Sequence, residues 1–163
     1  MPAGLYVVST PIGNLRDITL RALDILSSAD EVLAEDTRTT RRLLDAHAVQ
    51  AKLSPYHDHN GAQRRPELLD KLAHGARLAL VSDAGTPLVS DPGLKLVRSV
   101  LEAGHEVFPI PGASALLAGL VKSGLASDRF MFCGFLPAKS GLRKRELSSL
   151  VRVPATLAFY ESG

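Results

Sequence analysis

The stretch RLALVSDAGTPLVSDPG, residues 77–93, joins a short apolar run to an unusual loop. The run 78–81 has the length and composition of a buried strand. Positions 82–93, which follow, contain two aspartates, two glycines and two prolines. A simple turn does not need so many residues with special backbone preferences. In open parallel sheets, ligands bind beyond the carboxyl ends of the strands. This loop is therefore predicted to hold a ligand.

Strand-like and helix-like patterns alternate on both sides of this stretch. In the segment 17–29, Ile18, Ala22 and Ile25 share one face of a helix, whereas Leu20 falls on the polar side. Alternation with short connections predicts an α/β fold, a mostly parallel open sheet with helices on both faces. The helix at 113–124 is apolar on nearly every side and is expected to be buried. The expected strands are 5–9, 31–35, 77–81 and 106–110, and the expected helices are 17–29, 36–47, 67–75, 93–104 and 113–124.

The pattern changes after about residue 123. Two strand-like segments, 129–137 and 155–162, flank a short charged helical stretch at 141–150. We predict an N-terminal α/β domain over residues 1–115 and the incomplete beginning of a C-terminal α/β domain over residues 116–163. The second part is too short to bury a core of its own.

Composition excludes several classes of protein. The formal net charge is only +2 and Cys133 is the single cysteine, so we expect neither a disulfide framework nor a thiolate metal cluster. His57 and His59 lack a cysteine partner and are a weak zinc signal, so no metal site is predicted and 56–60 is expected to be a loop. The N-terminus lacks a basic flank with a long apolar run, and no run reaches the roughly 18 residues of a membrane span. A cytoplasmic protein without a membrane partner is expected.

The loops at the strand ends favour one kind of ligand. The first loop contains Gly13 alone, so it lacks the G-x-G-x-x-G pattern that lets backbone approach a pyrophosphate, and no P-loop is present. A small ligand with a cationic group or hydroxyls suits the loop better, because Asp83 can accept charge-assisted hydrogen bonds from both. The alternative is that Asp83 and Asp91 serve only as turn and cap residues, with Asp91 capping the helix that begins near Pro92.

Six segments in order resemble the tetrapyrrole-methylase superfamily, and specifically its ribosomal RNA small subunit methyltransferase I branch. They are LYVVSTPIGNLRDITLRALDIL, LAEDTR, VSDAGTPLVSDPG, PIPGASALLAGLVKSGL, FCGFLPAK and the terminal FYES. The resemblance implies transfer of a methyl group from S-adenosylmethionine to the 2′-hydroxyl of a cytidine in small-subunit ribosomal RNA. It also implies a homodimer whose cofactor lies between two α/β domains. By resemblance, the cofactor contacts are Pro11, Ser82, Asp83, Ala84, Gly85, Thr86, Leu88, Ser114 and Ala115.

The substrate side is expected on the rim of the same cleft. The resemblance and the position of LAEDTR at a strand end make Glu35, Asp36 and Arg38 the catalytic candidates, since a ribose hydroxyl must lose a proton. The alternative is that Asp36 caps the following helix and Glu35 pairs with Arg38. RNA requires counter-charge, for which the candidates are Arg41, Arg42, Lys139 and Arg143, with Arg64 and Arg65 as a further basic pair.

Two rival functions remain open at this stage. One is a tetrapyrrole C-methyltransferase on the same fold, and the other is a non-catalytic domain that binds RNA or the ribosome but not the cofactor. Chains of the resembled branch continue past YESPHR, whereas this one ends in FYESG. Weak or absent methyl transfer by this polypeptide is therefore expected, unless a dimer partner or a further segment completes the site.

Overall fold

The computed structural model describes residues 1–90 and 92–161. The chain divides into two compact units, Met1–Ala113 and Ser114–Gly163, and each is described by itself. Asp91, with its predicted capping role, and the last two residues of the terminal FYESG lie outside the described residues.

A five-stranded parallel sheet forms the centre of the first unit. Its order is β3-β2-β4-β1-β5, with every neighbouring pair parallel. All residues of β1 and β2, and all of β4 except Arg77, are buried. Apart from Glu31 and Arg77, these segments are therefore continuous apolar runs rather than alternating ones. The strands are β1 Gly4–Val8, β2 Glu31–Ala34, β3 Leu53–Pro55, β4 Arg77–Val81 and β5 Val107–Ile110.

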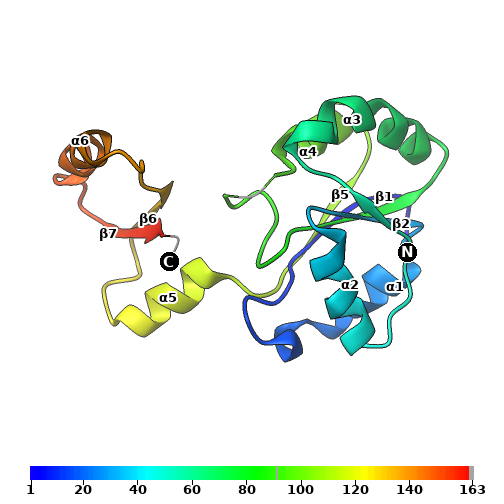
Figure 1. Cartoon of the computed structure of the whole chain (residues 1–163), viewed down its shortest axis with the longest axis horizontal. Coiled ribbons are helices and arrows are strands. Elements are labelled where there is room, and N and C mark those ends of the chain that lie inside the picture. Colours follow the sequence, from blue (N-terminus) through cyan, green and yellow to red (C-terminus); the bar gives the residue numbers. More distant parts are fainter. Residues whose placement is uncertain (91, 162–163) are drawn as a thin grey trace. The chain divides into compact units, whose positions relative to one another are not determined.

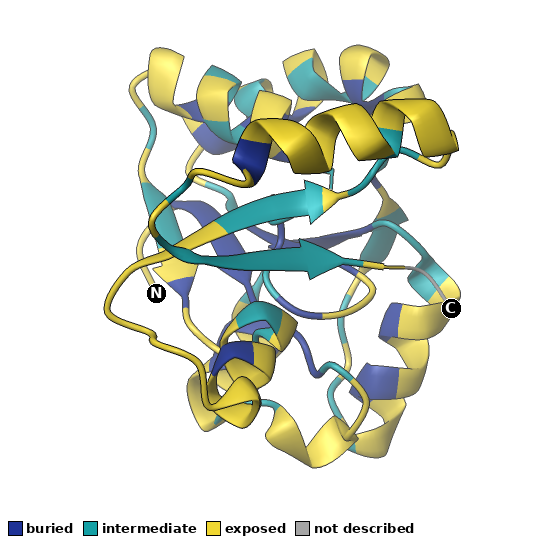
Figure 2. Cartoon of the chain, turned by 90° about the vertical axis from the view of Figure 1, so that its left-hand side faces the viewer, coloured by how far each residue is buried: buried dark blue, intermediate teal, exposed yellow. Residues whose placement is uncertain are grey.

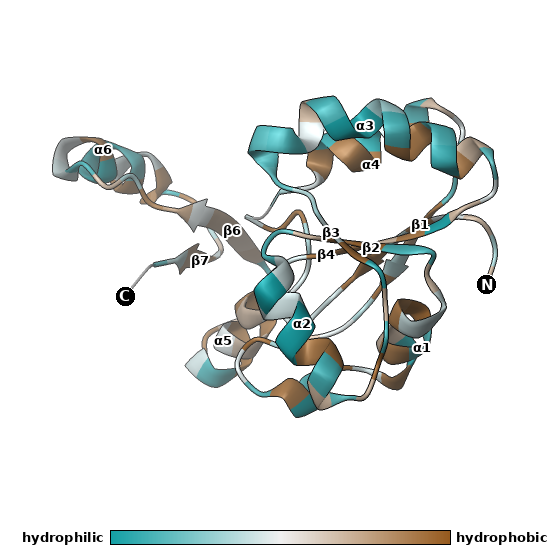
Figure 3. Ribbon diagram, turned by 45° about the vertical axis from the view of Figure 1, so that its right-hand side comes forward, coloured by the Kyte–Doolittle hydropathy of each residue, from teal (hydrophilic) through white to brown (hydrophobic). Residues whose placement is uncertain are grey.

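Helices cover both faces of this sheet (Figure 1). Ile25 and Leu26 of α1 and Leu44 of α2 pack with Val8 and Val32 in one core cluster. Leu68 of α3 and Leu96 of α4 belong to a second cluster on the opposite face. Figure 3 shows hydrophobic strands at the centre and hydrophilic outer surfaces on α2 and α3. The helices are α1 Leu20–Ser28, α2 Thr37–Ala46, α3 Asp58–Ala73 and α4 Leu94–Glu102, with a short 3-10 helix, η1, at Leu15–Asp17.

The expected α/β fold is confirmed, with two corrections to its elements. The edge strand β3 was not predicted, because three residues ending in Pro55 carry too little pattern to be recognised. Helix α3 begins at Asp58 rather than at 67, so the loop expected at 56–60 is wrong for its second half. Its first turn is held by Asn60, which accepts from the His57 backbone N–H at 3.0 Å and donates to the Pro55 carbonyl at 3.0 Å.

The second unit is a two-stranded parallel sheet with two helices. Among its described residues only Leu120 and Leu150 are buried, and Figure 2 shows α6 exposed along most of its length. The expectation that the helix at 113–124 is buried is wrong in this structure, since Leu117 and Val121 are exposed. The elements are α5 Ala115–Ser123, β6 Phe130–Phe135, α6 Ser140–Leu150 and β7 Thr156–Tyr160. Among the described residues, no helix has the length and apolar character needed to cross a bilayer.

Candidate functional site

Hydrogen bonds fasten the loops after β1 and β4 to each other at the carboxyl edge of the sheet. The N–H of Thr10 donates to the carbonyl of Gly85 at 2.8 Å, and the N–H of Gly85 donates back to Thr10 at 3.1 Å. The hydroxyl of Thr10 also donates to the carbonyl of Ser82 at 3.1 Å. Ser9 and Thr86 share a hydroxyl–hydroxyl hydrogen bond of 3.0 Å. Backbone and side-chain hydrogen bonds therefore hold the two loops together.

The loop after β5 also contacts the loops after β1 and β4. The hydroxyl of Thr86 lies 3.4 Å from the carbonyl of Ala113, and the N–H of Ser9 donates to Ile110 at 3.2 Å. A Cβ atom on Gly112 would lie 2.9 Å from the Cβ of Ser9, so glycine is required for this close approach. Sequence reasoning missed the buried hydroxyls of Ser9 and Thr10, although their position directly after a buried strand was the available signal.

The backbone of the loop 82–90 adopts unusual conformations. Gly85 has φ +82°, and the non-glycine residues Leu88 and Ser90 have φ 73° and 62°. L-residues rarely occupy this region, and such strain persists only where the surroundings enforce it, most often at functional sites. This backbone supports the prediction that the loop is shaped for a ligand.

The structure brings together seven of the nine predicted cofactor residues. Pro11, Ser82 and Gly85 are buried, Thr86 and Leu88 are half-buried, and Asp83 and Ala84 are exposed. Ser114 and Ala115 belong to the second unit, where Ser114 is the N-cap of α5 and its hydroxyl accepts from the N–H of Leu117 at 3.4 Å.

The groups of this loop suit a cationic, hydroxyl-bearing ligand such as S-adenosylmethionine. Residues 82–90 contain one carboxylate, that of Asp83, and no lysine or arginine. An exposed carboxylate can bind an ammonium or ribose hydroxyls, whereas a phosphate would be repelled by it. The strained backbone of 85–90 supplies carbonyl and N–H groups in directions that regular structure does not offer. The residues present therefore fit this cofactor.

The predicted catalytic candidates lie at the end of the neighbouring strand, β2. Asp36 is the N-cap of α2 and accepts from the N–H of Arg38 at 2.8 Å. The guanidinium of Arg38 donates to both carboxylate oxygens of Asp36, with its Nη2 at 2.7 Å. Hydrogen bonds from the Arg38 side chain and backbone lower the pKa of Asp36 to about 2. Glu35, also at this edge, is half-buried.

Asp83 connects this strand end to the loop 82–90. Its Oδ1 accepts from the backbone N–H of Asp36 at 3.0 Å. The strands β2 and β4 are neighbours whose last residues, Ala34 and Val81, lie opposite each other, so the loops that follow them begin side by side. The candidate catalytic and cofactor residues are thus in direct contact within the first unit.

The arginines and the lysine that are predicted to bind RNA differ in their exposure and in their hydrogen bonds. Arg41 and Arg42 are exposed on α2, and Arg38 and Arg41 line a shallow hollow with Thr37, Leu53 and Pro55. In the second unit, Lys139 is exposed, whereas Arg143 donates to the carbonyls of Pro137 and Ala138 at 3.1 and 3.3 Å. Arg143 therefore shapes the start of α6 as well as contributing charge.

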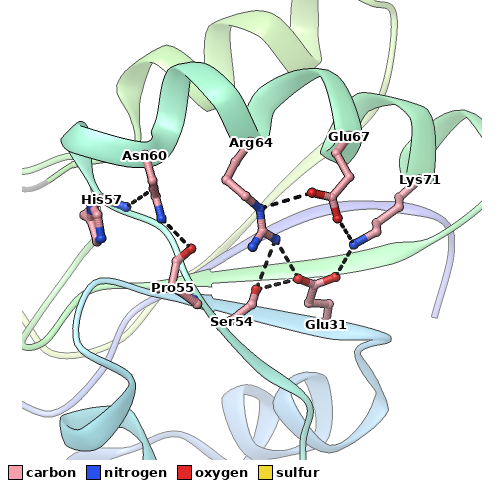
Figure 4. A network of polar contacts seen from close by, with 8 residues as sticks. All are labelled: Glu31, Ser54, Pro55, His57, Asn60, Arg64, Glu67 and Lys71. Carbon is pink, nitrogen blue, oxygen red and sulfur yellow. Dashed lines mark hydrogen bonds and ion pairs between the residues drawn. The ribbon is translucent and has the colours of Figure 1, made fainter.

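Arg64 belongs to an internal ion-pair network rather than to a basic surface (Figure 4). Its guanidinium lies 2.8 Å from Glu31, a buried residue at the start of β2, and 3.4 Å from Glu67. Lys71 pairs with the same two carboxylates at 2.6 Å each. The grouping of Arg64 with Arg65 as a free basic pair is corrected by this finding. Glu31 lies at the amino end of its strand, away from the loops of the candidate site.

Glu31 is held ionised by this network. Burial acts to raise its pKa, but hydrogen bonds from Lys71, Ser54 and Arg64 outweigh burial and lower the pKa to about 2. The network ties β2, β3 and α3 together. Across residues 1–90 and 92–161, no group of three histidine, cysteine, aspartate or glutamate side chains is arranged to hold a metal ion.

Comparison with known proteins places this geometry in context. The sequence profile of the family described as Tetrapyrrole (Corrin/Porphyrin) Methylases matches residues 4–163. A protein from Mesorhizobium japonicum named ribosomal RNA small subunit methyltransferase I is 55% identical over 97% of this chain and 54% of its own length. Its namesake from Escherichia coli O157:H7 is 53% identical over 97% of this chain and 55% of its own length. The chain spans about half the length of these relatives.

Solved structures of related fold are more distant in sequence. A diphthine synthase is 20% identical, with a TM-score of 0.72 over 96% of this chain and 64% of its own. A uroporphyrin-III-C-methyltransferase from Thermus thermophilus is 21% identical, with a TM-score of 0.62 over 90% of this chain and 72% of its own. At this level of identity the similarity concerns the fold alone.

Proposed function

The chain belongs to the tetrapyrrole (corrin/porphyrin) methylase family, and on that premise we propose that it is part of an S-adenosylmethionine-dependent methyltransferase. The acceptor in this proposal is the 2′-hydroxyl of a cytidine in small-subunit ribosomal RNA. The observation that carries the proposal is the high identity, over nearly the whole chain, to relatives named ribosomal RNA small subunit methyltransferase I. Because the chain spans about half of those relatives, it contributes one half of the machinery.

In this proposal the joined loops of the first unit hold the cofactor. When bound, S-adenosylmethionine supplies a methyl group on a sulfonium whose positive charge is lost on transfer. The carboxylate of Asp83 binds its ammonium or ribose hydroxyls, and the backbone of 84–88, fixed by Thr10 and Thr86, contacts the rest. Pro11, buried directly after Thr10, forms the apolar wall beside them. Ser114 and Ala115 complete the predicted set.

The acceptor hydroxyl must lose its proton as the methyl group is transferred. Pairing with Arg38 lowers the pKa of Asp36 to about 2, so its carboxylate is a poor proton acceptor. In this proposal Asp36 has a holding role, and Glu35, the other candidate at the same strand end, accepts the proton. Arg38 then faces the RNA backbone rather than the reacting oxygen.

The RNA is held by cations on two elements. Arg41 and Arg42 project from α2, and Lys139 and Arg143 stand at the start of α6. Each cation that contacts a phosphate releases a counterion and makes binding dependent on salt. A cytoplasmic location follows from a ribosomal RNA substrate, and the homodimer rests on the resemblance alone.

The position of the methyl group in the product RNA tests the proposal. Small ribosomal subunits are incubated with S-adenosylmethionine labelled in its methyl group, and the RNA is then hydrolysed in alkali. A methylated 2′-hydroxyl blocks cleavage, so the label is expected in an alkali-resistant dinucleotide that contains cytidine. The enzyme for this assay is a fusion of residues 1–161 to the second half of the Escherichia coli relative, and the 163-residue chain alone is expected to give weak transfer or none.

The rival functions give different results in the same assay. Label in alkali-labile mononucleotides would show base methylation and contradict the assigned acceptor. Transfer to a tetrapyrrole macrocycle but not to RNA would indicate the C-methyltransferase. A fusion protein that binds the subunits but not S-adenosylhomocysteine would indicate a non-catalytic RNA-binding domain.

A further inference from the structure

The carboxylate of Asp83 links two loops that lie far apart in the sequence. It leaves the loop after β4 and accepts the backbone N–H of Asp36, the residue that caps α2, at 3.0 Å. The carboxylate of Asp36 in turn accepts from the backbone N–H of Arg38 at 2.8 Å and binds its guanidinium through Nε and Nη2. These contacts form a continuous chain from the cofactor loop to an arginine on α2.

Arg38, the last residue in this series of contacts, is exposed but held in one orientation. The side chain of Arg38 is 86% exposed, and exposed ion pairs add little to folding stability. A guanidinium has five N–H donors in a fixed plane. Two of its nitrogens are occupied by Asp36, so the remaining donors point away from that carboxylate. The arrangement therefore fixes the direction of the free donors.

The free donors stand beside a surface suited to a nucleic-acid backbone. Arg38 and Arg41 line the same shallow hollow, one helical turn apart on α2. Planar guanidinium groups with free donors bind phosphate oxygens through charge-assisted hydrogen bonds. A phosphate in the hollow would meet both arginines, provided that the first turn of α2 keeps its place.

We infer that Asp83 is a positioning residue, which fixes the start of α2 and, through Asp36, aims the guanidinium of Arg38 at a phosphate of the substrate RNA. This inference rests on the proposed function, because it takes the ligand of Arg38 to be RNA. It gives Asp83 a second task beside its proposed contact with the cofactor. Since one carboxylate serves both, cofactor and RNA binding are coupled, and each changes the affinity for the other by the same factor.

Two substitutions at Asp83 separate the two tasks. Asp83→Asn removes the negative charge offered to the cofactor but keeps an oxygen that accepts from the Asp36 N–H. Asp83→Ala removes both. The matched control is Asp58→Ala, which makes the same change in net charge on an exposed residue of α3. Each variant is made in the fusion protein used for the methyl-transfer assay. S-adenosylhomocysteine is titrated into it by calorimetry, and its binding to a fluorescein-labelled oligocytidylate is followed by fluorescence anisotropy.

The sign of the change in RNA affinity decides the outcome. Loss of a negative charge alone should slightly strengthen RNA binding, so Asp58→Ala and Asp83→Asn should bind RNA as well as the wild type or better. Asp83→Ala should bind it roughly three- to tenfold more weakly, as expected when a phosphate contact is lost, with a salt slope smaller by about 1. Both Asp83 variants should bind S-adenosylhomocysteine more weakly.

A double-mutant cycle shows whether Asp83 acts through Arg38. In an Arg38→Ala background, Asp83→Ala should cause no further loss of RNA affinity, because the contact it positions is already absent. Additive losses would overturn the inference, and so would an Asp83→Ala variant that binds RNA as Asp58→Ala does. Melting temperatures of all variants confirm that each is folded. A wild-type fusion protein that binds neither probe would instead overturn the proposed function, and the inference with it.

Discussion

Thr10 and Gly85 exchange both of their backbone hydrogen bonds, at 2.8 and 3.1 Å, and so join the loops that follow β1 and β4. This isolated bridge lies outside the named strands of the sheet. It holds the strained backbone of 85–90 against the buried end of β1. The shape of the candidate cofactor site depends on it.

Replacement of Gly85 tests this dependence. A Cβ atom at this position would lie 3.4 Å from Ile12 Cγ2, so space permits Gly85→Ala, but the backbone has φ +82°. An L-residue in this conformation costs about 1–2 kcal/mol. We expect the free energy of unfolding in urea to fall by that amount and the affinity for S-adenosylhomocysteine to fall as well. Gly75→Ala, also at positive φ but in the turn after α3, is the control.

An unchanged affinity in Gly85→Ala, with the expected loss of stability, would show that the bridge does not shape the cofactor site. Gly75→Ala should lose stability to a similar degree while its affinity for S-adenosylhomocysteine stays the same. The comparison separates a local effect on the loop from a general effect on folding.

The network around Glu31 should control stability in acid. The pKa of Glu31 in the folded chain is about 2, lowered from 4.5. A carboxyl whose pKa is lowered by folding stabilises the protein above its unfolded pKa, and this contribution is lost as the pH falls from about 4.5 to about 2. Glu31→Gln should lower the free energy of unfolding by about 2–4 kcal/mol at pH 7, because it removes one partner from a largely buried ion pair.

The size of this effect should shrink as the pH falls. Near pH 2 the wild type and Glu31→Gln should have similar free energies of unfolding, since Glu31 is then about half protonated in the folded chain and almost fully protonated in the unfolded chain. Glu67→Gln, whose carboxylate is 52% exposed, should have a smaller effect throughout. Equal effects of the two variants at pH 7 would contradict the role given to Glu31.

The basic face of α2 should determine the salt dependence of RNA binding. Arg41→Ala combined with Arg42→Ala should weaken binding of labelled oligocytidylate and reduce the slope of log affinity against log salt by about 1–2. Arg98→Ala, an exposed arginine on α4, is the control on the other face of the sheet. If Arg98→Ala weakens binding as strongly per charge, the RNA is not held specifically by α2.

The first unit should fold without the second. Both core clusters consist of residues up to Ile110, so the chain 1–113 retains them entirely. We expect it to unfold in a single cooperative thermal transition, followed by circular dichroism at 222 nm. A gradual loss of signal would place essential packing in residues 114–163 and contradict the predicted division of the chain.

The sequence predicted the strand–helix alternation because buried parallel strands are apolar throughout and their helices have one apolar face. It did not predict β3, where Leu53–Pro55 is defined by pairing with β2 rather than by its own residues. The first turns of α3 were also missed, because that segment is polar and contains Pro66. Its place on the sheet depends on Arg64 and Lys71 meeting Glu31, a tertiary contact.

The same distinction applies to the candidate site. The loop 82–93 could be recognised because glycine, proline and aspartate have local conformational meanings. The bond from Asp36 to Asp83 could not, because it joins residues that become neighbours only when β2 and β4 pair. Arg64 appeared free in the sequence for the same reason, since its partner lies on another strand.

The cofactor site is tested most directly by following the backbone amide resonances of the ¹⁵N-labelled fusion protein during a titration with S-adenosylhomocysteine. We expect saturable shifts concentrated at Ser82–Thr86 and at Thr10, with α3 and α4 unaffected. Shifts confined to other parts of the first unit, or no shifts in a folded fusion protein, would contradict the assignment of this loop as the cofactor site.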